Sequence, residues 1–206
     1  MIQRSLAPAI LAALKDTPVV LVIGARQTGK STLATWLTAE KHPARYLTLD
    51  DAVTLASARA DPTGFVARLQ GPIVLDEVQR APELFMPIKA AVDRDRRPGR
   101  FLLTGSANVL LLPRLSESLA GRMEVLTLWP FSQGEVEGVR DGFIDAVFDR
   151  ALPALSRDVE GWEGLVSRML RGGYPEALAR AADDRRQAWF GSYITTILQR
   201  DVRELA

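Results

Sequence analysis

Residues 19–32 read VVLVIGARQTGKST, and this stretch decides the fold. The apolar, mostly β-branched run over residues 19–23 predicts a strand that is buried on both faces of a sheet. A loop that contains Gly24 and Gly29 follows it, and a helical pattern begins at Lys30. This order of strand, loop and helix fits the spacing G-x-x-x-x-G-K-[ST] of a phosphate-binding loop, the Walker A motif.

The residue types of this loop suit a phosphate chain. Glycine permits backbone conformations in which successive N–H groups turn inward around an anion, and the following helix points its positive end at the same place. Lys30 is expected to reach the β- and γ-phosphate oxygens, and the Ser31 hydroxyl is expected to bind Mg²⁺. The residues expected to bind nucleotide are Gly24, Ala25, Arg26, Gln27, Thr28, Gly29, Lys30, Ser31 and Thr32.

Two alternatives remain open for this loop. Arg26 either adds a phosphate contact or folds back onto an acid such as Asp50. The loop as a whole could be a glycine-containing turn that binds nothing, but the strand before it and the helix after it disfavour that interpretation.

The second motif is IVLDEVQ at residues 73–79, a hydrophobic strand that ends in two acids. Asp76 would hold Mg²⁺ through its water shell, as in a Walker B motif. Glu77 would orient and deprotonate the water that attacks the γ-phosphate, which favours hydrolysis over transfer to a small molecule. The alternative is a pair of acids that merely ends a strand at the surface.

Two further motifs supply candidate catalytic residues. In FLLTGS, residues 101–106, either Thr104 or Ser106 could sense the γ-phosphate, or the hydroxyl could simply cap the turn. In SLAGR, residues 118–122, Arg122 could reach a γ-phosphate as an arginine finger, within its own chain or from a neighbouring subunit of a homo-oligomer. An arginine that faces the helix dipole at a helix end is the alternative.

Composition restricts the remaining classes of function. The 206 residues carry a net charge of +1, which does not indicate a nucleic-acid binder, and the basic run at residues 94–100 is more typical of a solvated loop. The absence of cysteine excludes disulfides and thiolate chemistry, and the single histidine, His42, cannot form a metal cluster. Because the amino terminus does not read as a signal peptide and no apolar run reaches 18 residues, we expect a cytoplasmic protein without membrane contact.

Strand patterns alternate with helical patterns through the first part of the chain. The strands are expected at residues 19–23, 46–49, 73–75, 101–104 and 124–128, and this alternation predicts a parallel sheet with right-handed crossovers. A helix over residues 82–93 contains Pro87, which should kink or split it. Another helix is expected at residues 114–120.

Beyond residue 130 only helical patterns remain. We expect a core at residues 1–130 and a helical lid at residues 131–206, and the last helix, residues 186–203, carries an apolar stripe that needs a surface to cover it. That stripe consists of Phe190, Ile194, Ile197 and Leu198.

Taken together, the motifs GARQTGKST, YLTLDD, IVLDEVQRAPELF, FLLTGSA, SLAGR, RGGYPEAL and RDVREL resemble the prokaryotic AAA-type ATPases whose core is followed by a C-terminal domain of unknown function. The resemblance covers nearly the whole chain. It implies an ATP-binding and ATP-hydrolysing core with residues 24–32 as Walker A, Asp76 and Glu77 as Walker B, and a sensor at Thr104 or Ser106. Arg122 matches the family's Gly-Arg position. Since family members usually continue well beyond RDVREL, we expect a truncated chain.

The leading hypothesis is a Mg²⁺-dependent ATPase with a three-layer α/β/α fold, strand order 5-1-4-3-2 and a helical lid. Nucleotide would bind at the carboxyl ends of the strands. The client, a protein or a nucleic acid, is not identified by the resemblance. An ATP-gated binding module with little turnover is the second hypothesis. A small-molecule kinase is the third, and Glu77 weakens it.

Overall fold

The computed structural model describes residues 2–106, 119–139, 142–149 and 161–205. The chain divides into two compact units. One is Arg4–Trp129, which we call the sheet unit, and the other joins Met1–Gln3 to Pro130–Ala206 and is called the helical unit. Each unit is described by itself.

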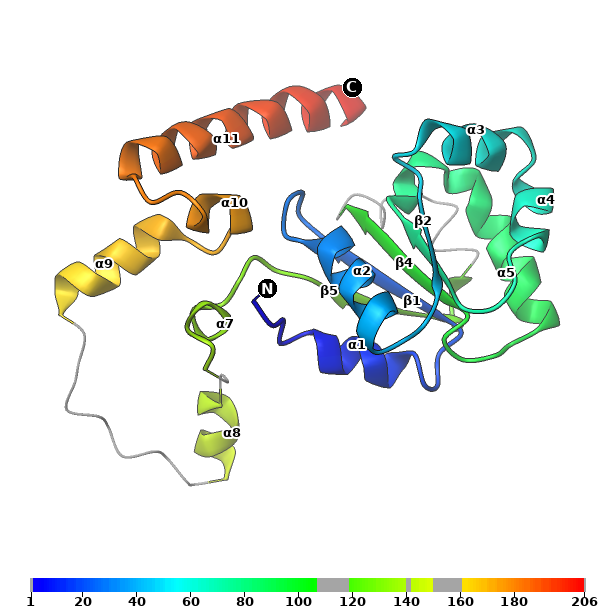
Figure 1. The fold of residues 1–206 in the computed structure, drawn as a ribbon, viewed down its shortest axis with the longest axis horizontal. Helices are drawn as coiled ribbons and strands as arrows, with labels where there is room; N and C mark the ends of the chain where they lie inside the picture. The colour runs from blue at the N-terminus through cyan, green and yellow to red at the C-terminus, as the bar shows by residue number, and fades with distance from the viewer. Residues whose placement is uncertain (1, 107–118, 140–141, 150–160, 206) are drawn as a thin grey trace. The chain divides into compact units, whose positions relative to one another are not determined.

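A five-stranded parallel sheet forms the centre of the sheet unit (Figure 1). Its order is β2-β3-β4-β1-β5, which confirms the predicted order 5-1-4-3-2. The interior strand β1, between β4 and β5, is buried at all six positions, as its continuous apolar sequence requires. The strands are β1 (Val19–Gly24), β2 (Arg45–Thr48), β3 (Ile73–Asp76), β4 (Phe101–Ser106) and β5 (Met123–Thr127).

Helices cover both faces of this sheet and complete the three layers (Figure 1). Helices α1 (Ala7–Ala13) and α2 (Lys30–Glu40) pack on the face that carries Val20, Val22 and Val74. The helices α3 (Ala52–Ala60), α4 (Pro62–Ala67) and α5 (Phe85–Arg94) pack on the other face. Because side chains alternate along a strand, odd-numbered residues of β1 face one layer and even-numbered residues face the other.

The segment predicted as one helix over residues 82–93 starts with a 3₁₀ turn and then continues as an α-helix that runs unbroken through Pro87. Short 3₁₀ turns at Val78–Arg80 (η1) and Pro82–Leu84 (η2) precede α5, which begins at Phe85. Pro87 therefore lies in the first turn of α5, where a backbone N–H has no partner within the helix, and the missing donor costs nothing there. Of the helix predicted at residues 114–120, residues 114–118 lie outside the described part.

The helical unit contains α7 (Gln133–Glu137), α8 (Phe143–Phe148), α9 (Trp162–Arg171), α10 (Pro175–Leu178) and α11 (Asp183–Leu205). A capping box of Ser132 and Glu135 starts α7. Within this unit, Tyr174 packs against Trp189 and Tyr193 of α11, with ring centroids 5.7 and 5.1 Å away. Among the described residues, no helix is both long and apolar enough to cross a membrane.

Candidate active site

The candidate residues lie at the carboxyl ends of three neighbouring parallel strands, β1, β4 and β3, which we call the carboxyl edge of the sheet. Gly24, the last residue of β1, lies opposite Ser106, the last residue of β4. The register of β3 with β4 pairs Leu75 with Leu103, so that Asp76 and Thr104 come next at the same edge. Helix α2 starts from this edge directly after the glycine loop. Parallel strands thus bring together motifs that lie far apart in the sequence.

The two glycines of the loop are needed for different reasons. A Cβ on Gly24 would lie 2.3 Å from the main-chain oxygen of Leu128, so the close approach of two backbone segments excludes a side chain. Gly29 has a φ of +93°, in the left-handed region that other residues adopt only at a cost. Between them, the buried Thr28 donates its hydroxyl to the Ala25 oxygen at 3.0 Å and braces the loop.

Lys30 is folded back along the loop. Its Nζ donates to the main-chain oxygens of Gly24 at 3.1 Å and Ala25 at 2.8 Å, and the residue is only 5% exposed. Burial lowers the pKa of Lys30, and the carboxylates of Glu77 and Asp76 oppose that shift. The negative charges of Glu77 and Asp76 are therefore close enough to Lys30 to favour its protonated form.

Asp76 is almost fully buried, at 3% exposure, and accepts hydrogen bonds from three hydroxyl groups. Ser31 Oγ donates to Oδ1 at 3.1 Å, Tyr46 OH donates to Oδ2 at 2.8 Å, and Thr104 Oγ1 also donates to Oδ1. Ser31 belongs to α2, Tyr46 to β2 and Thr104 to β4, the two strands on either side of β3. These bonds compensate the burial of the carboxylate and hold it in one orientation.

Tyr46 was missed by sequence reasoning, which read the motif YLTLDD without assigning a role to its tyrosine. Its ring packs with the core on the α2 side of the sheet, and its hydroxyl reaches the next strand. Burial raises the pKa of Tyr46, and the hydrogen bond to Asp76 raises it further. The hydroxyl therefore stays protonated and remains a donor. An aromatic residue in a strand is usually read as core, and no local signal distinguished this one.

Glu77 lies just beyond the end of β3, in an uncommon conformation with φ of +61°. Its backbone N–H donates to Thr104 Oγ1 at 3.1 Å, so the Thr104 hydroxyl connects the two adjacent acids. Its carboxylate accepts a hydrogen bond from Gln79 Nε2, and Gln79 Oε1 accepts the N–H of Ser106 at 3.3 Å. Gln79 is the second residue of the site, after Tyr46, that sequence reasoning missed.

Arg122 is not brought to this edge. It immediately precedes β5, and its main-chain oxygen accepts the N–H of Val19, the first residue of β1, at 3.3 Å. A strand of this length separates it from the glycine loop by about 17 Å, more than an arginine side chain spans. Its guanidinium instead pairs with Asp93, whose pKa this hydrogen bond lowers. The predicted finger within one chain is therefore wrong for this conformation.

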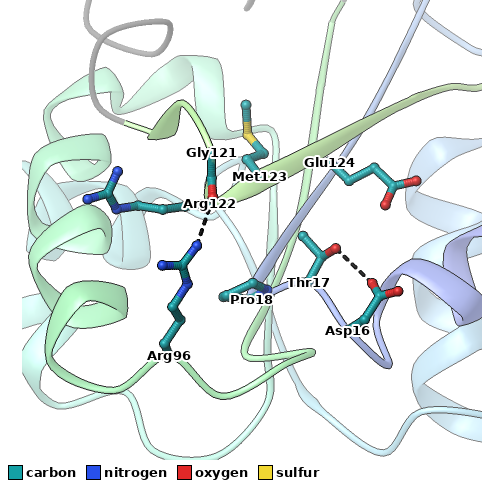
Figure 2. A pocket seen from close by; sticks show the side chains of 8 residues that line it. All are labelled: Asp16, Thr17, Pro18, Arg96, Gly121, Arg122, Met123 and Glu124. Carbon is teal, nitrogen blue, oxygen red and sulfur yellow. Dashed lines mark hydrogen bonds between the residues drawn. The ribbon is translucent and has the colours of Figure 1, made fainter.

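A pocket of about 520 Å³ lies at this opposite edge (Figure 2). Arg122 and Glu124 line it together with Arg96, which donates to the Gly121 oxygen at 2.9 Å. In Figure 2, Arg96 and Arg122 lie on one side of the pocket and Asp16 and Glu124 on the other, and none of the predicted Walker residues lines it.

Asp50 is one of the acids expected as an alternative partner for Arg26. Asp50 pairs with Arg80, from the turn after β3, rather than with Arg26. The positive charge of Arg26 contributes to the lowered pKa of Lys30, which places the two cations near each other at the loop.

The residues present suit Mg²⁺. A buried carboxylate hydrogen-bonded to a hydroxyl at the start of a helix is a donor set of hard oxygens, which Mg²⁺ prefers. The described residues contain no group of three or more histidines, cysteines or acids that would enclose a metal. A cation here would thus take its other ligands from phosphates and water, as Mg²⁺ usually does.

The chain is similar to a curated protein and to a family domain. The chain is 36% identical over 203 residues to the uncharacterized protein Rv2008c of Mycobacterium tuberculosis, covering 98% of this chain and 40% of the relative. The chain thus spans less than half the length of that curated relative. A domain of unknown function, DUF8612, matches residues 163–206.

Solved structures share the fold at low sequence identity. The Walker-type ATPase PABY2304 of Pyrococcus abyssi has a TM-score of 0.58 at 18% identity, covering 100% of this chain and 75% of that one. AMPPCP-bound DnaA from Aquifex aeolicus has a TM-score of 0.50 at 14% identity, covering 97% of this chain and 64% of that one. The family model described as an AAA domain matches residues 16–137, more than half of the chain, and includes the glycine loop and both acids. This protein therefore belongs to the AAA domain family.

Proposed function

We propose that this protein binds ATP together with Mg²⁺ and hydrolyses the bond to the γ-phosphate. The observation that carries the proposal is the meeting of Ser31 with Asp76 at 3.1 Å, beside Lys30 and Glu77, at the carboxyl edge of a parallel sheet. Membership of the AAA domain family supports it. The binding of AMPPCP, an ATP analogue, by DnaA from Aquifex aeolicus supports nucleotide as the ligand of this fold.

Lys30 would make the main contact with the phosphates. On binding, its ammonium exchanges the main-chain oxygens of Gly24 and Ala25 for β- and γ-phosphate oxygens. The loop amides and the start of α2 add partial positive charge at the same place. Since burial disfavours the charged form of Lys30, a nearby triphosphate would stabilise that charge.

Ser31 and Asp76 would hold the metal. The Ser31 hydroxyl and the Asp76 carboxylate would offer oxygens to the hydrated cation, while hydrogen bonds from Tyr46 and Thr104 keep the carboxylate of Asp76 in place. When bound, Mg²⁺ neutralises charge on the β- and γ-phosphate oxygens.

Glu77 would act as the general base. Its carboxylate takes a proton from water as the water oxygen attacks the γ-phosphorus, and the bond from that phosphorus to the bridging oxygen breaks, leaving ADP with the electron pair. The Thr104 hydroxyl is engaged by Asp76 and by the backbone of Glu77. We therefore select Ser106, which lies opposite Gly24, as the residue that senses the γ-phosphate.

Other parts of the hypothesis stay predictions. They are the division into a core at 1–130 and a lid at 131–206, a role of Arg122 in a neighbouring subunit, the cytoplasmic location and the client. The chain spans 40% of its curated relative, so the activity of a longer protein is likewise a proposal.

The test measures nucleotide affinity by titration calorimetry and phosphate release at saturating ATP. Lys30→Ala should weaken ATP binding by about 10- to 100-fold, because it removes a charge-assisted contact. Glu77→Gln should retain affinity and lower turnover by about 100-fold or more. The exposed neighbours Lys41 and Glu40 provide matched controls, Lys41→Ala and Glu40→Gln, which should behave as wild type.

The outcome separates the hypotheses. Tight nucleotide binding with almost no turnover in the wild type would favour the ATP-gated module. Equal behaviour of the wild type, Lys30→Ala and Glu77→Gln would contradict both. Transfer of phosphate to an added acceptor would favour a kinase.

A further inference from the structure

The side chain of Gln79 joins two parts of the candidate site that come from different strands. Its Nε2 donates to Glu77 Oε2, and its Oε1 accepts the N–H of Ser106 at 3.3 Å. A carboxylate only accepts and a backbone N–H only donates, so a single orientation of the amide satisfies both partners. Gln79 lies in η1, directly after β3, whereas Ser106 ends β4.

Glu77 needs such a support because little else restrains its side chain. It lies beyond the strand, it is partly exposed, and its φ of +61° is uncommon for a residue with a side chain. Its backbone is held through the N–H bond to Thr104 Oγ1 at 3.1 Å. A glutamate with three rotatable bonds retains rotamer freedom unless its carboxylate is also bound.

We propose that Gln79 is the positioning residue of Glu77. The amide of Gln79 holds one carboxylate oxygen and leaves the other, Oε1, to take the proton of the attacking water. The carbonyl of Gln79 anchors this arrangement to the end of β4, beside Ser106. A displacement of the end of β4, which carries Ser106, would therefore displace the carboxylate of Glu77 as well. This inference rests on the proposed ATPase function and assigns a role to a residue that has none in either Walker motif.

Two substitutions distinguish the hydrogen bond of Gln79 to Ser106 from its hydrogen bond to Glu77. Gln79→Met retains the length of the side chain and loses both hydrogen bonds. Gln79→Glu keeps an acceptor for the Ser106 N–H, but it loses the donor to Glu77 and introduces a like charge beside it. A residue that merely braces the turn tolerates Gln79→Glu, whereas a positioning residue does not.

The experiment measures ATP turnover, nucleotide affinity and amide hydrogen exchange of the full chain. Both variants should lower kcat by about 10- to 100-fold, because a small displacement of a general base costs that much. The Kd for ATP should stay within about twofold of wild type. Gln79→Met should speed exchange at the Ser106 amide, and Gln79→Glu should not. The exposed Gln70 gives the control Gln70→Met, which should change nothing.

Three outcomes would overturn the proposal. One is an unchanged or increased kcat in both Gln79 variants. Another is wild-type turnover in Gln79→Glu with a loss only in Gln79→Met, which would mean that the bond to Ser106 alone matters. The third is unaltered exchange at Ser106 in Gln79→Met, a result that does not depend on activity. Absence of turnover in the wild type would instead refute the proposed ATPase, and the role of Gln79 with it.

Discussion

Ser31 Oγ donates a hydrogen bond to Asp76 Oδ1 at 3.1 Å, across 45 residues of sequence. Ser31 lies in the first turn of α2, and Asp76 is the last residue of β3. The bond therefore joins the start of α2, after the glycine loop, to the end of β3, at the point where both would share one cation in the proposed function. If Ser31 turns to the metal, the hydroxyls of Tyr46 and Thr104 still hold the carboxylate of Asp76 in its orientation. Substitutions around Asp76 should therefore change Mg²⁺ binding, and substitutions in the glycine loop should change phosphate binding.

Tyr46→Phe should weaken the Mg²⁺-dependent part of nucleotide binding by about 10-fold, because loss of a partner that orients a metal-binding carboxylate has this effect. Binding of ATP in excess chelator should stay unchanged, since Tyr46 contacts Asp76 rather than the loop. Titration of Mg²⁺ at fixed ATP measures the difference. Tyr174→Phe, in the helical unit, is the control. An equal loss with and without Mg²⁺ would assign Tyr46 a purely structural role.

Gly29→Ala and Gly71→Ala should lower the free energy of unfolding by similar amounts, about 1 kcal/mol each. Both glycines have positive φ, +93° and +77°, and at neither would a Cβ meet an atom within 4 Å. Only Gly29→Ala should also weaken ATP binding, because only Gly29 belongs to the loop. Denaturant unfolding and calorimetric titration test the pair. Equal ATP affinity in the two variants would show that the loop does not contact the nucleotide.

ATP affinity should fall at alkaline pH, starting below the ordinary lysine pKa of 10.5. Burial lowers the pKa of Lys30 in the free protein, and bound phosphates would raise it by favouring the charged form. Binding is therefore independent of pH while Lys30 is protonated, and it weakens as pH rises through the lowered value, by at most about tenfold per unit. Lys30→Ala provides the reference, and its affinity should not show this step. A wild-type profile that matches that of Lys30→Ala would argue against a phosphate contact.

Arg122→Ala should leave ATP affinity unchanged, because Arg122 lies at the sheet edge opposite the loop. It should lower the melting temperature slightly at neutral pH. The hydrogen bond from Arg122 lowers the pKa of Asp93, and the charges of Lys89 and Arg96 add to this effect. A lowered carboxyl pKa stabilises the fold above the ordinary value and loses its contribution as pH falls through the lowered one. The difference in melting temperature should therefore shrink in acid.

The same variant tests the remaining alternative for Arg122. A finger supplied by a neighbouring subunit predicts that Arg122→Ala loses turnover only at protein concentrations at which the wild type self-associates. Sedimentation and phosphate release over one concentration series would show this. Wild-type turnover at every concentration would exclude a finger from either chain.

The sequence patterns determined the positions of the strands and their parallel pairing, whereas the strand order was expected only from the likeness to a known class of ATPases. A continuous apolar run such as residues 19–23 can be buried only in the middle of a sheet, and helical segments between strands force parallel pairing. The glycine loop was also readable, since its backbone demands are local to residues 24–29. The split expected at Pro87 does not occur, because Pro87 falls in the first turn of α5, where its missing N–H is tolerated.

Only the tertiary structure decided which side chains meet. Asp76 joins Tyr46 from a strand 30 residues away, and Gln79 joins Ser106 across 27 residues, through the registers of neighbouring strands. Asp50 takes Arg80 rather than Arg26, and Arg122 takes Asp93 at the far edge of the sheet. A motif records the residue types that a chemistry requires, but the distance between two side chains depends on strand order, register and helix packing, which no single motif contains.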